Sequence, residues 1–561
     1  MIREDTWLEK RREKLWFSFL LNALILFVLL AVFRPVYETN DDMGIAGLVN
    51  MVKGESDAHV LFPHYLFGLL WELLYRLHQG VPWLPLFEYF CMFFSFTAIT
   101  YVLIRKLKSN SSVWITAILV FWFSYEGYIQ VQFTKTAGIV STAGLLLLFY
   151  AVTQEKVSGK ALVLGMLFSC TGFMFRKNQF FAEAALLTGI GVYLLLQLRG
   201  KGRKEQYKNF LLYFGTFGSL LIFVFALRIV NQQCYTSQEW QAFRRMNSVR
   251  RDLYDHGFPP YEENKEAYEE LGIDEVSYRM LRSWNQMDTE RFDVETLEGI
   301  LALRQQKKLT PGLVKNFVRE FAAKIFKVPC FYCFVLICIY WLLWGRHGKA
   351  ELLALFYEAL AVFLVYLYQY YDGRYLLNRV DVGLWLAVSC TVLWTFVMKE
   401  QEYFPARTGA ALTVTVTLLL VYGLRGEWRV NAKTDLEKMM KNRSALETIH
   451  EDAEHVYVTA VKTVSFHQSY EVFEAVPFNM AENICPLGGW TAITPLYRRA
   501  AERYGITNPI KDVIGNEKAY LVTGDIDLMM EYIQVHYDQN AKAEIVHDFG
   551  KYKAYAIQKG D

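Results

Sequence analysis

Residues 16–33 read WFSFLLNALILFVLLAVF, and residues 34–42, which follow directly, read RPVYETNDD. The first stretch is apolar and long enough to cross the roughly 30 Å hydrocarbon core of a bilayer as one helix. Several basic residues precede it: Arg3, Lys10, Arg11, Arg12 and Lys14. The second stretch has no small-x-small cleavage site. The pattern therefore predicts an uncleaved first span that enters from the cytoplasm, not a signal peptide.

The composition supports a membrane protein and argues against a nucleic-acid partner. Of the 561 residues, 53% are hydrophobic and 16% aromatic, while the formal net charge is only +2. No basic run is interleaved with aromatics in the way that single-strand binding requires. Most of the eight cysteines lie in apolar runs, so they form no disulfide framework. The pair Cys330 and Cys333 is interpreted as apolar packing.

Ten further apolar runs of suitable length follow, which predicts a bundle of about eleven transmembrane helices. They cover residues 84–104, 113–129, 136–153, 160–174, 179–198, 209–230, 328–345, 351–370, 382–398 and 409–425. Alternate threading puts every basic loop on the cytoplasmic side, as the positive-inside rule requires. These loops are residues 105–108, 199–204, 345–349 and 398–407.

This threading requires that LFPHYLFGLLWELLYRLH, residues 61–78, does not cross the membrane. The stretch carries Glu72, Arg76 and two histidines, which suits a helix lying along the outer face better than one buried in lipid. Three large segments then face outward: residues 34–83, residues 231–326, and everything after about 426. We predict a transmembrane domain over 1–425 and an extracytoplasmic α/β domain over 426–561. The latter has strands in HVYVTAV and KAYLVTG, a helix in DIDLMMEYIQVHY and a closing strand pair over 543–558.

The acidic pair Asp41 and Asp42 stands just beyond the first span, at the start of an amphipathic helical pattern. One interpretation is structural: Asn40 or Asp41 caps a helix, and acid in the first turn is favoured by the helix dipole. The other is chemical. A carboxylate held at the membrane surface could accept a proton from a hydroxyl that attacks a lipid-borne electrophile, and its neighbour could assist.

The layout resembles the GT-C superfamily of polytopic glycosyltransferases, such as protein O-mannosyltransferases and aminoarabinose transferases, which use polyprenyl-phosphate sugars. The resemblance rests on the acidic pair, on GIAGLVNMVKG as a juxtamembrane helix reaching Gly54, and on the Pro-led surface helix. The chain has Asp-Asp where Asp-Glu is usual, and Phe-Pro-His where Pro-Pro or His-Pro-Pro is usual. The resemblance implies sugar transfer with inversion at the outer face of the cytoplasmic membrane, with Asp41 and Asp42 as catalytic residues.

Basic residues at the predicted outer edge break the positive-inside trend. Arg176 and Lys177 lie in FMFRKNQFF, Arg374 and Arg379 in QYYDGRYLLNRVD, and Lys135 in QFTKTAG. They could extend to anionic headgroups. They could equally bind a donor phosphate, which arginine pairs in bidentate fashion. The arginines of FRRMNSVRRDLYDHG, residues 243–257, are interpreted as a solvated charged face.

Three other residues are weaker site candidates. Glu126 would be costly facing lipid, so we expect it to face a polar cavity. His64 could reach this cavity or act as an interfacial anchor, and Trp284 could stack on a sugar or belong to a core. Asp42 and Glu126 could hold a divalent cation such as Mg²⁺ or Mn²⁺; no other cofactor is indicated.

The sequence therefore predicts an inverting glycosyltransferase that moves a sugar from a polyprenyl-phosphate carrier to an acceptor in the bacterial cell envelope. Membrane lipid is the other expected partner. A transporter or lipid flippase is one alternative, which predicts ionisable groups at the bilayer midplane, whereas the candidates here gather at the outer rim. A non-catalytic envelope scaffold or sensor is the other, and it predicts that Asp41→Asn leaves function intact.

Overall fold

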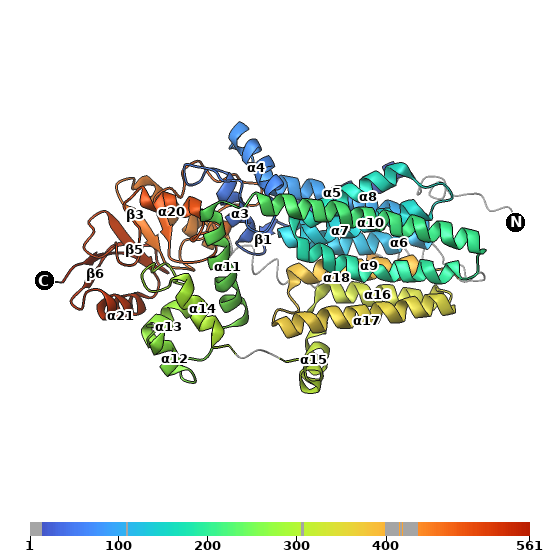
Figure 1. Ribbon diagram of the computed structural model, residues 1–561. Coiled ribbons are helices and arrows are strands. Elements are labelled where there is room, and N and C mark those ends of the chain that lie inside the picture. Colours follow the sequence, from blue (N-terminus) through green and yellow to red (C-terminus); the bar gives the residue numbers. More distant parts are fainter. Residues whose placement is uncertain are drawn as a thin grey trace.

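The computed structural model describes residues 14–107, 110–304, 308–398, 414, 415, 418 and 436–560. It is mostly helical and has two parts (Figure 1). A bundle of long, roughly parallel helices forms one part, and the described chain begins at its far end. The other part is an outer unit that contains the C-terminal sheet and covers the opposite end of the bundle.

Ten helices form the bundle: α2 (Leu15–Val32), α5 (Trp83–Leu107), α6 (Asn110–Tyr128), α7 (Phe133–Thr153), α8 (Gly159–Phe175), α9 (Lys177–Leu198), α10 (Arg203–Gln233), α16 (Pro329–Trp344), α17 (Lys349–Asp372) and α18 (Asn378–Thr395). Helix α7 is buried almost throughout and contacts α5, α8, α9 and α18. Small residues let α7 and α8 approach closely: a Cβ on Gly144 would lie 2.3 Å from the backbone nitrogen of Ser169.

Among the described residues, six of these helices are long and apolar enough to cross a membrane, fewer than the eleven spans predicted. A seventh is reached only if α15 (Pro311–Lys324) with η1 (Ile325–Lys327) and α16, bent by 90°, count as one span. Helix α8 has 17 residues and α16 has 16, so each is only about 25 Å long. The predicted run 409–425 lies largely outside the described residues.

The outer unit is built from the segments predicted to face outward. The first contributes α3 (Asp41–Val49) and α4 (Tyr65–Leu77), and the second contributes α11 (Gln238–His256), α12 (Lys265–Glu270), α13 (Glu275–Arg282) and α14 (Val294–Ala302). Helix α4 buries Phe67, Trp71 and Tyr75 and exposes a row of leucines, as an interfacial helix would. Helix α3 is shorter than the predicted helix to Gly54, because Met51 and Gly54 adopt positive φ angles of 62° and 80°.

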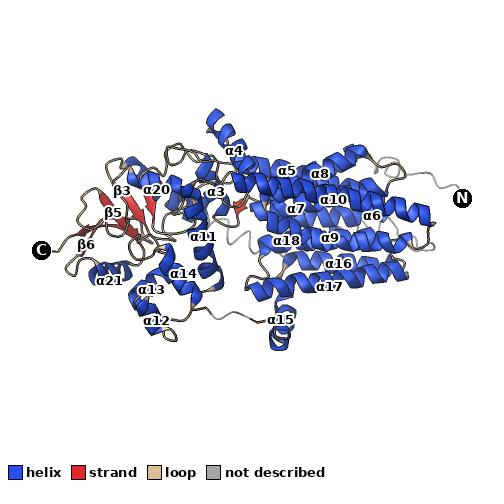
Figure 2. Cartoon of the chain, in the orientation of Figure 1, coloured by secondary structure: helices blue, strands red, loops and turns tan. Residues whose placement is uncertain are grey.

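The C-terminal part contains a five-stranded sheet in the order β4-β3-β5-β7-β6 (Figure 2). Its strands are β3 (Val456–Thr459), β4 (Ile484–Pro486), β5 (Ala519–Thr523), β6 (Lys542–Asp548) and β7 (Lys553–Gln558). The first three run parallel, while β7 is antiparallel to β5 and β6. Helices α20 (Pro495–Glu502) and α21 (Ile526–His536) accompany the sheet. The prediction identified all of these elements except β4 and α20.

A two-residue strand pair fixes the first outer loop to the bundle. Strand β1 (Val36–Tyr37) pairs in parallel with β2 (Gln130–Val131), which lies between α6 and α7. The pairing holds the chain just before α3 beside the start of α7. Asp41 and Asp42 are therefore positioned at the outer end of the most buried helix of the bundle.

Candidate functional site

Asp41 is the first residue of α3, and its side chain is partly exposed. Asn40 occupies the N-cap position but makes no side-chain capping bond. The indole nitrogen of Trp490, which belongs to the C-terminal part, donates to Asp41 Oδ1 at 3.3 Å. Thr39 Oγ1 lies 3.4 Å from Asp41 Oδ2. One carboxylate oxygen is thus oriented by Trp490, while the carboxylate remains accessible.

Asp42 points the other way and is fully buried. Its Oδ1 accepts the backbone N–H of Phe133 at 2.8 Å, and its carboxyl lies within hydrogen-bonding reach of Glu88, on α5. No described residue donates to Asp42 Oδ2 or to either oxygen of Glu88, so a proton shared between the two carboxyls would engage two of these three oxygens. Burial, and then the negative charge of Asp41, raise the pKa of Asp42 to about 7. Glu88 was not among the residues predicted for the site.

Arg176 is the single residue that separates α8 from α9. Its guanidinium donates to Thr134 Oγ1 at 2.7 Å and lies beside the stacked rings of Phe62 and Phe133, 5.5 and 5.3 Å from their centroids. Burial lowers the pKa of Arg176 to about 10. The charge of Asp41 opposes this shift.

Arg374 and Arg379 lie close enough to Arg176 for their charges to lower its pKa further. Helix α17 ends at Gly373, whose left-handed conformation (φ 89°) turns the chain toward α18. Arg374 pairs with Asp255 of α11 at 2.5 Å. Arg379, in the first turn of α18, is partly exposed and has no ion-pair partner among the described residues. Four predicted residues, Asp41, Arg176, Arg374 and Arg379, are thus brought together.

Arg250 joins this cluster, although its arginine-rich segment was interpreted as a solvated face. It is 7% exposed, and its pKa is lowered mainly by burial while the charges of Asp255 and Asp41 oppose the shift. Its neighbours Arg245 and Arg251 are exposed as expected. Trp284 reaches this cluster only through Tyr254, the residue before Asp255. The two rings are stacked with their centroids 4.2 Å apart. The ring therefore packs against protein on one face.

Lys135 and Glu126 belong to a separate group in which the cation is already paired. The Lys135 ammonium is fully buried and pairs with Glu38 at 2.7 Å and Glu126 at 3.1 Å. Asn378 also donates to Glu126 Oε2, at 3.0 Å. Two carboxylates already compensate this lysine. The geometry gives Lys135 no free charge for a donor phosphate, contrary to its predicted role.

Lys177 and His64 are engaged by other groups than the residues around Asp41. Lys177 is exposed at the start of α9, and the charged groups that influence it are Arg228, Arg244 and Arg251. His64 caps α4: its Nδ1 accepts the N–H of Leu66 at 3.1 Å and its Nε2 lies 2.8 Å from the carbonyl of Leu227. Both ring nitrogens are used, and burial lowers the pKa of His64. Its contacts are those of a structural cap.

A pocket of about 310 Å³ lies near Asp41, although neither Asp41 nor the arginine cluster lines it. Its walls come from residues 33–38, from the outer end of α6 and from residues 438–472 of the C-terminal part. Tyrosine rings, Gln468 and the Arg34–Glu471 ion pair (2.5 Å) line it. His467 also lines the pocket, and burial lowers its pKa to about 4. The negative charge of Asp41 is close enough to oppose this shift. The pocket thus has a mixed aromatic and polar lining next to Asp41.

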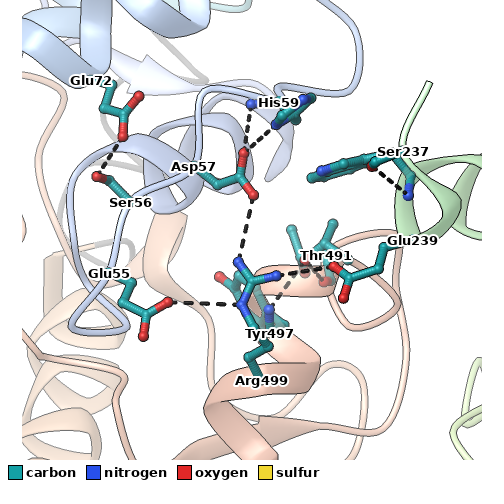
Figure 3. Close-up of polar contacts among 12 residues, drawn as sticks. Glu55, Ser56, Asp57, His59, Glu72, Ser237, Glu239, Thr491, Tyr497 and Arg499 are labelled. Carbon is teal, nitrogen blue, oxygen red and sulfur yellow. Dashed lines mark hydrogen bonds and ion pairs between the residues drawn. The ribbon is translucent and has the colours of Figure 1, made fainter. Parts of the chain in front are cut away.

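The C-terminal part is fixed to the outer loops by a group of ion pairs centred on Arg499 of α20 (Figure 3). Arg499 lies 3.2 Å from Glu239, 3.8 Å from Asp57 and 3.9 Å from Glu55. Asp57 in turn contacts His59 Nδ1 at 2.6 Å. These contacts join three segments that are distant in the sequence, and they hold the part of the chain that carries Trp490.

Two buried carboxyls within the bundle contradict the expectation that ionisable groups gather at the outer rim. Glu358 lies near the middle of α17, is 2% exposed and has no hydrogen-bond partner among the described residues. Glu183 of α9 is fully buried and accepts from Gln179 at 2.5 Å. As for a cation, the described residues contain no group of three His, Cys, Asp or Glu side chains that could hold a metal ion. Asp42 and Glu126, the proposed metal ligands, are engaged by different partners.

No protein-family model, curated protein or solved structure matches the chain.

Proposed function

We propose that the protein is an inverting glycosyltransferase that uses a polyprenyl-phosphate sugar at the outer face of the cytoplasmic membrane. One observation carries the proposal: a partly exposed carboxylate, Asp41, stands among arginines whose charges exceed those of the nearby acids. Arg176, Arg250, Arg374 and Arg379 gather there with Asp41 and Asp255. The excess positive charge, at the end of a bundle of apolar helices, suits an anionic lipid-linked substrate.

The donor phosphate binds the arginines that have no full partner. Among the described residues, Arg379 has no ion pair, and Arg176 donates only to the neutral Thr134. Arginine binds phosphate oxygens through two parallel hydrogen bonds. These groups neutralise the negative charge that grows on the phosphate as it leaves, which is the interaction that lowers the barrier. The polyprenyl chain extends into the bilayer between helices.

Asp41 acts as the general base. The acceptor hydroxyl transfers its proton to the Asp41 carboxylate while the acceptor oxygen forms a bond to the anomeric carbon. The bond between that carbon and the phosphate oxygen breaks, and its electron pair stays on the phosphate. Attack opposite the phosphate inverts the configuration. Trp490 fixes the carboxylate through Oδ1. Asp42 shapes α3 and does not touch substrate, since it is fully buried.

The acceptor occupies the 310 Å³ pocket beside Asp41. Tyrosine rings, amides and charged groups are the side chains that bind sugars and other polyols, by stacking and by hydrogen bonds. The pocket opens on the outer unit, so a cell-envelope glycan, lipid or protein can present its hydroxyl there. In this orientation the N-terminus faces the cytoplasm and the C-terminal part lies outside.

The test is transfer of labelled sugar from polyprenyl-phosphate donors by the purified protein in lipid nanodiscs. Asp41→Asn should reduce turnover by about 10²- to 10⁴-fold, the usual contribution of a general base. Asp42→Asn is the matched control and should retain most activity, because an amide oxygen still accepts the N–H of Phe133. Equal activity of wild type and Asp41→Asn, or no binding of any polyprenyl-phosphate sugar, would sink the proposal and favour a scaffold or sensor.

A transporter or flippase is the second candidate, and Glu358 is the observation that favours it. A buried mid-helix carboxyl without a partner is typical of ion- or proton-coupled pathways. The two functions separate experimentally. A transporter moves labelled lipid or solute across proteoliposomes without chemical change and loses this activity in Glu358→Gln, whereas a glycosyltransferase variant Glu358→Gln keeps sugar transfer.

A further inference from the structure

A second cavity, of about 1290 Å³, lies at the end of the bundle far from the outer unit. It is formed where α5 and α7 end and α8 begins, and its wall includes the turn over residues 154–158. Asp42 contacts Phe133 at the start of α7, whereas this cavity lies at the other end of that 21-residue helix, so it is far from the acidic pair. The donor, the acceptor and the general base make no use of it.

The rim of this cavity is basic. Arg105, Lys106, Lys156 and Lys160 line it, and Glu155 is the one acid among the lining residues that the structure describes. Lys156 and Lys160 are exposed and form no ion pair with any described residue. Lys160 also sits in the first turn of α8, where the helix dipole disfavours a cation. A basic rim around the start of a helix is a charge arrangement that an anion would stabilise.

The deeper wall of the cavity is apolar. Phe94, Leu147, Leu164 and Phe168 line it, and Phe168 lies eight residues along α8 from Lys160, about 12 Å deeper. Leu164 is 45% exposed and Phe94 is 38% exposed, so the apolar wall opens sideways. A soluble anion would contact only the basic rim. An amphiphile would place its anionic head at the rim and its hydrocarbon tail against the apolar wall.

We propose that this cavity binds an anionic phospholipid of the cytoplasmic leaflet. The lipid phosphate lies against Lys156 and Lys160, and an acyl chain lies along Leu164 and Phe168. Basic pockets between helices on this side of a membrane are suited to such headgroups. The inference rests on the membrane orientation of the proposed function and not on sugar transfer. The lipid fills the space between α5, α7 and α8, and thereby braces the helix whose other end precedes Arg176.

The test compares thermal unfolding of the full chain in phosphatidylcholine nanodiscs with and without phosphatidylglycerol, together with native mass spectrometry of retained lipid. Lys156→Gln/Lys160→Gln should weaken phosphatidylglycerol retention about thirtyfold, since each lysine near an anionic lipid contributes roughly a factor of five. Lys204→Gln/Lys208→Gln, on the exposed turn and start of α10 at the same end, is the control and should retain wild-type lipid binding.

Two further measurements distinguish a lipid headgroup from a soluble phosphate as the bound anion. Glycerol phosphate and inorganic phosphate, added to protein in neutral detergent, should give none of the stabilisation that the lipid gives. Equal stabilisation by these soluble anions would overturn the proposal, as would equal lipid retention by the two double variants. Sugar transfer does not enter the readout. A protein that enters nanodiscs and transfers sugar but shows no preference for phosphatidylglycerol refutes this inference alone.

Discussion

Two basic groups stand near the same end of the bundle, and they differ in how their charge is compensated. Lys135 is fully buried between two glutamates at 2.7 and 3.1 Å. The arginine cluster around Asp41 instead keeps Arg379 without an ion pair among the described residues. A buried cation that already pairs with two carboxylates needs no further anion. Where cations outnumber the nearby acids, their charge is balanced only when an anion binds. We therefore expect the first group to serve stability, whereas the proposed function assigns an anionic ligand to the second.

The largest expected effect is on the stability of the Lys135 group. Lys135→Met leaves the buried Glu126 and the partly buried Glu38 without a cation, which should cost about 3–5 kcal/mol in free energy of unfolding. The double variant Lys135→Met/Glu126→Gln should recover part of that loss. Denaturant unfolding in detergent measures both. If Lys135→Met unfolds like wild type but loses sugar transfer, Lys135 binds substrate and the comparison fails.

The opposite pattern is expected for Arg379. Arg379→Gln should lower kcat about 10²-fold, as loss of one donor to a developing negative charge usually does. Its free energy of unfolding should change by less than about 0.5 kcal/mol, because the side chain is partly exposed and unpaired. Arg379→Lys, which keeps the charge but not the two parallel hydrogen bonds, should lie between wild type and Arg379→Gln. Loss of stability without loss of kcat would contradict the assignment.

The pH dependence of stability should distinguish Asp42 from Asp41. The folded-state pKa of Asp42 is raised from 3.8 to about 7, so between these values the folded protein holds a proton that the unfolded chain has released. Asp42 therefore destabilises the fold progressively as pH rises from 4 to 7, by at most about 1.4 kcal/mol per pH unit. Thermal unfolding at pH 5 and pH 8 should show that Asp42→Asn stabilises more at pH 8. An equal effect at both values would refute this.

The smallest effect is expected at Trp490. Trp490→Phe keeps a ring against Gly44 and Phe62 but loses the donor to Asp41 Oδ1. A neutral hydrogen bond contributes about 1 kcal/mol, so kcat should fall about fivefold while the KM for the donor stays constant. Stopped reactions across donor concentrations separate the two constants. A changed KM with unchanged kcat would place Trp490 in binding and not in orienting the base.

The helices of this fold could be predicted because long apolar runs are a strong local signal. Helices occupy ten of the eleven predicted runs, and the strands of HVYVTAV and KAYLVTG are β3 and β5. The span count was too high because run length in sequence does not show where a helix ends. Pro329 starts α16 at a 90° bend, which leaves a helix of 16 residues. Strand β4 has three residues, too few for a periodic pattern to reveal it.

The candidate site was predictable only where charge and position coincided. Asp41, Arg176, Arg374 and Arg379 are polar residues at the ends of apolar runs, and the structure brings them together. Trp490, His467 and Arg250 could not be found, because nothing local distinguishes them and only tertiary packing brings them to Asp41. Lys135 and Glu126 looked like site residues because their mutual pairing, and that with Glu38, is invisible in sequence.

The strand pair between β1 and β2 has a consequence for how this chain can change. Val36 is in register with Gln130 and Tyr37 with Val131, and Asp41 follows four residues after Tyr37. Because β2 belongs to the bundle, this pairing fixes the position from which the chain runs to α3. One inserted or deleted residue between Tyr37 and Asp41 would rotate the start of α3 by about 100°, so that one aspartate would take the direction of the other. Insertions after α3 in the first loop do not change the orientation of the two aspartates. We therefore expect the length of that part of the loop to vary more than the interval between Tyr37 and Asp41.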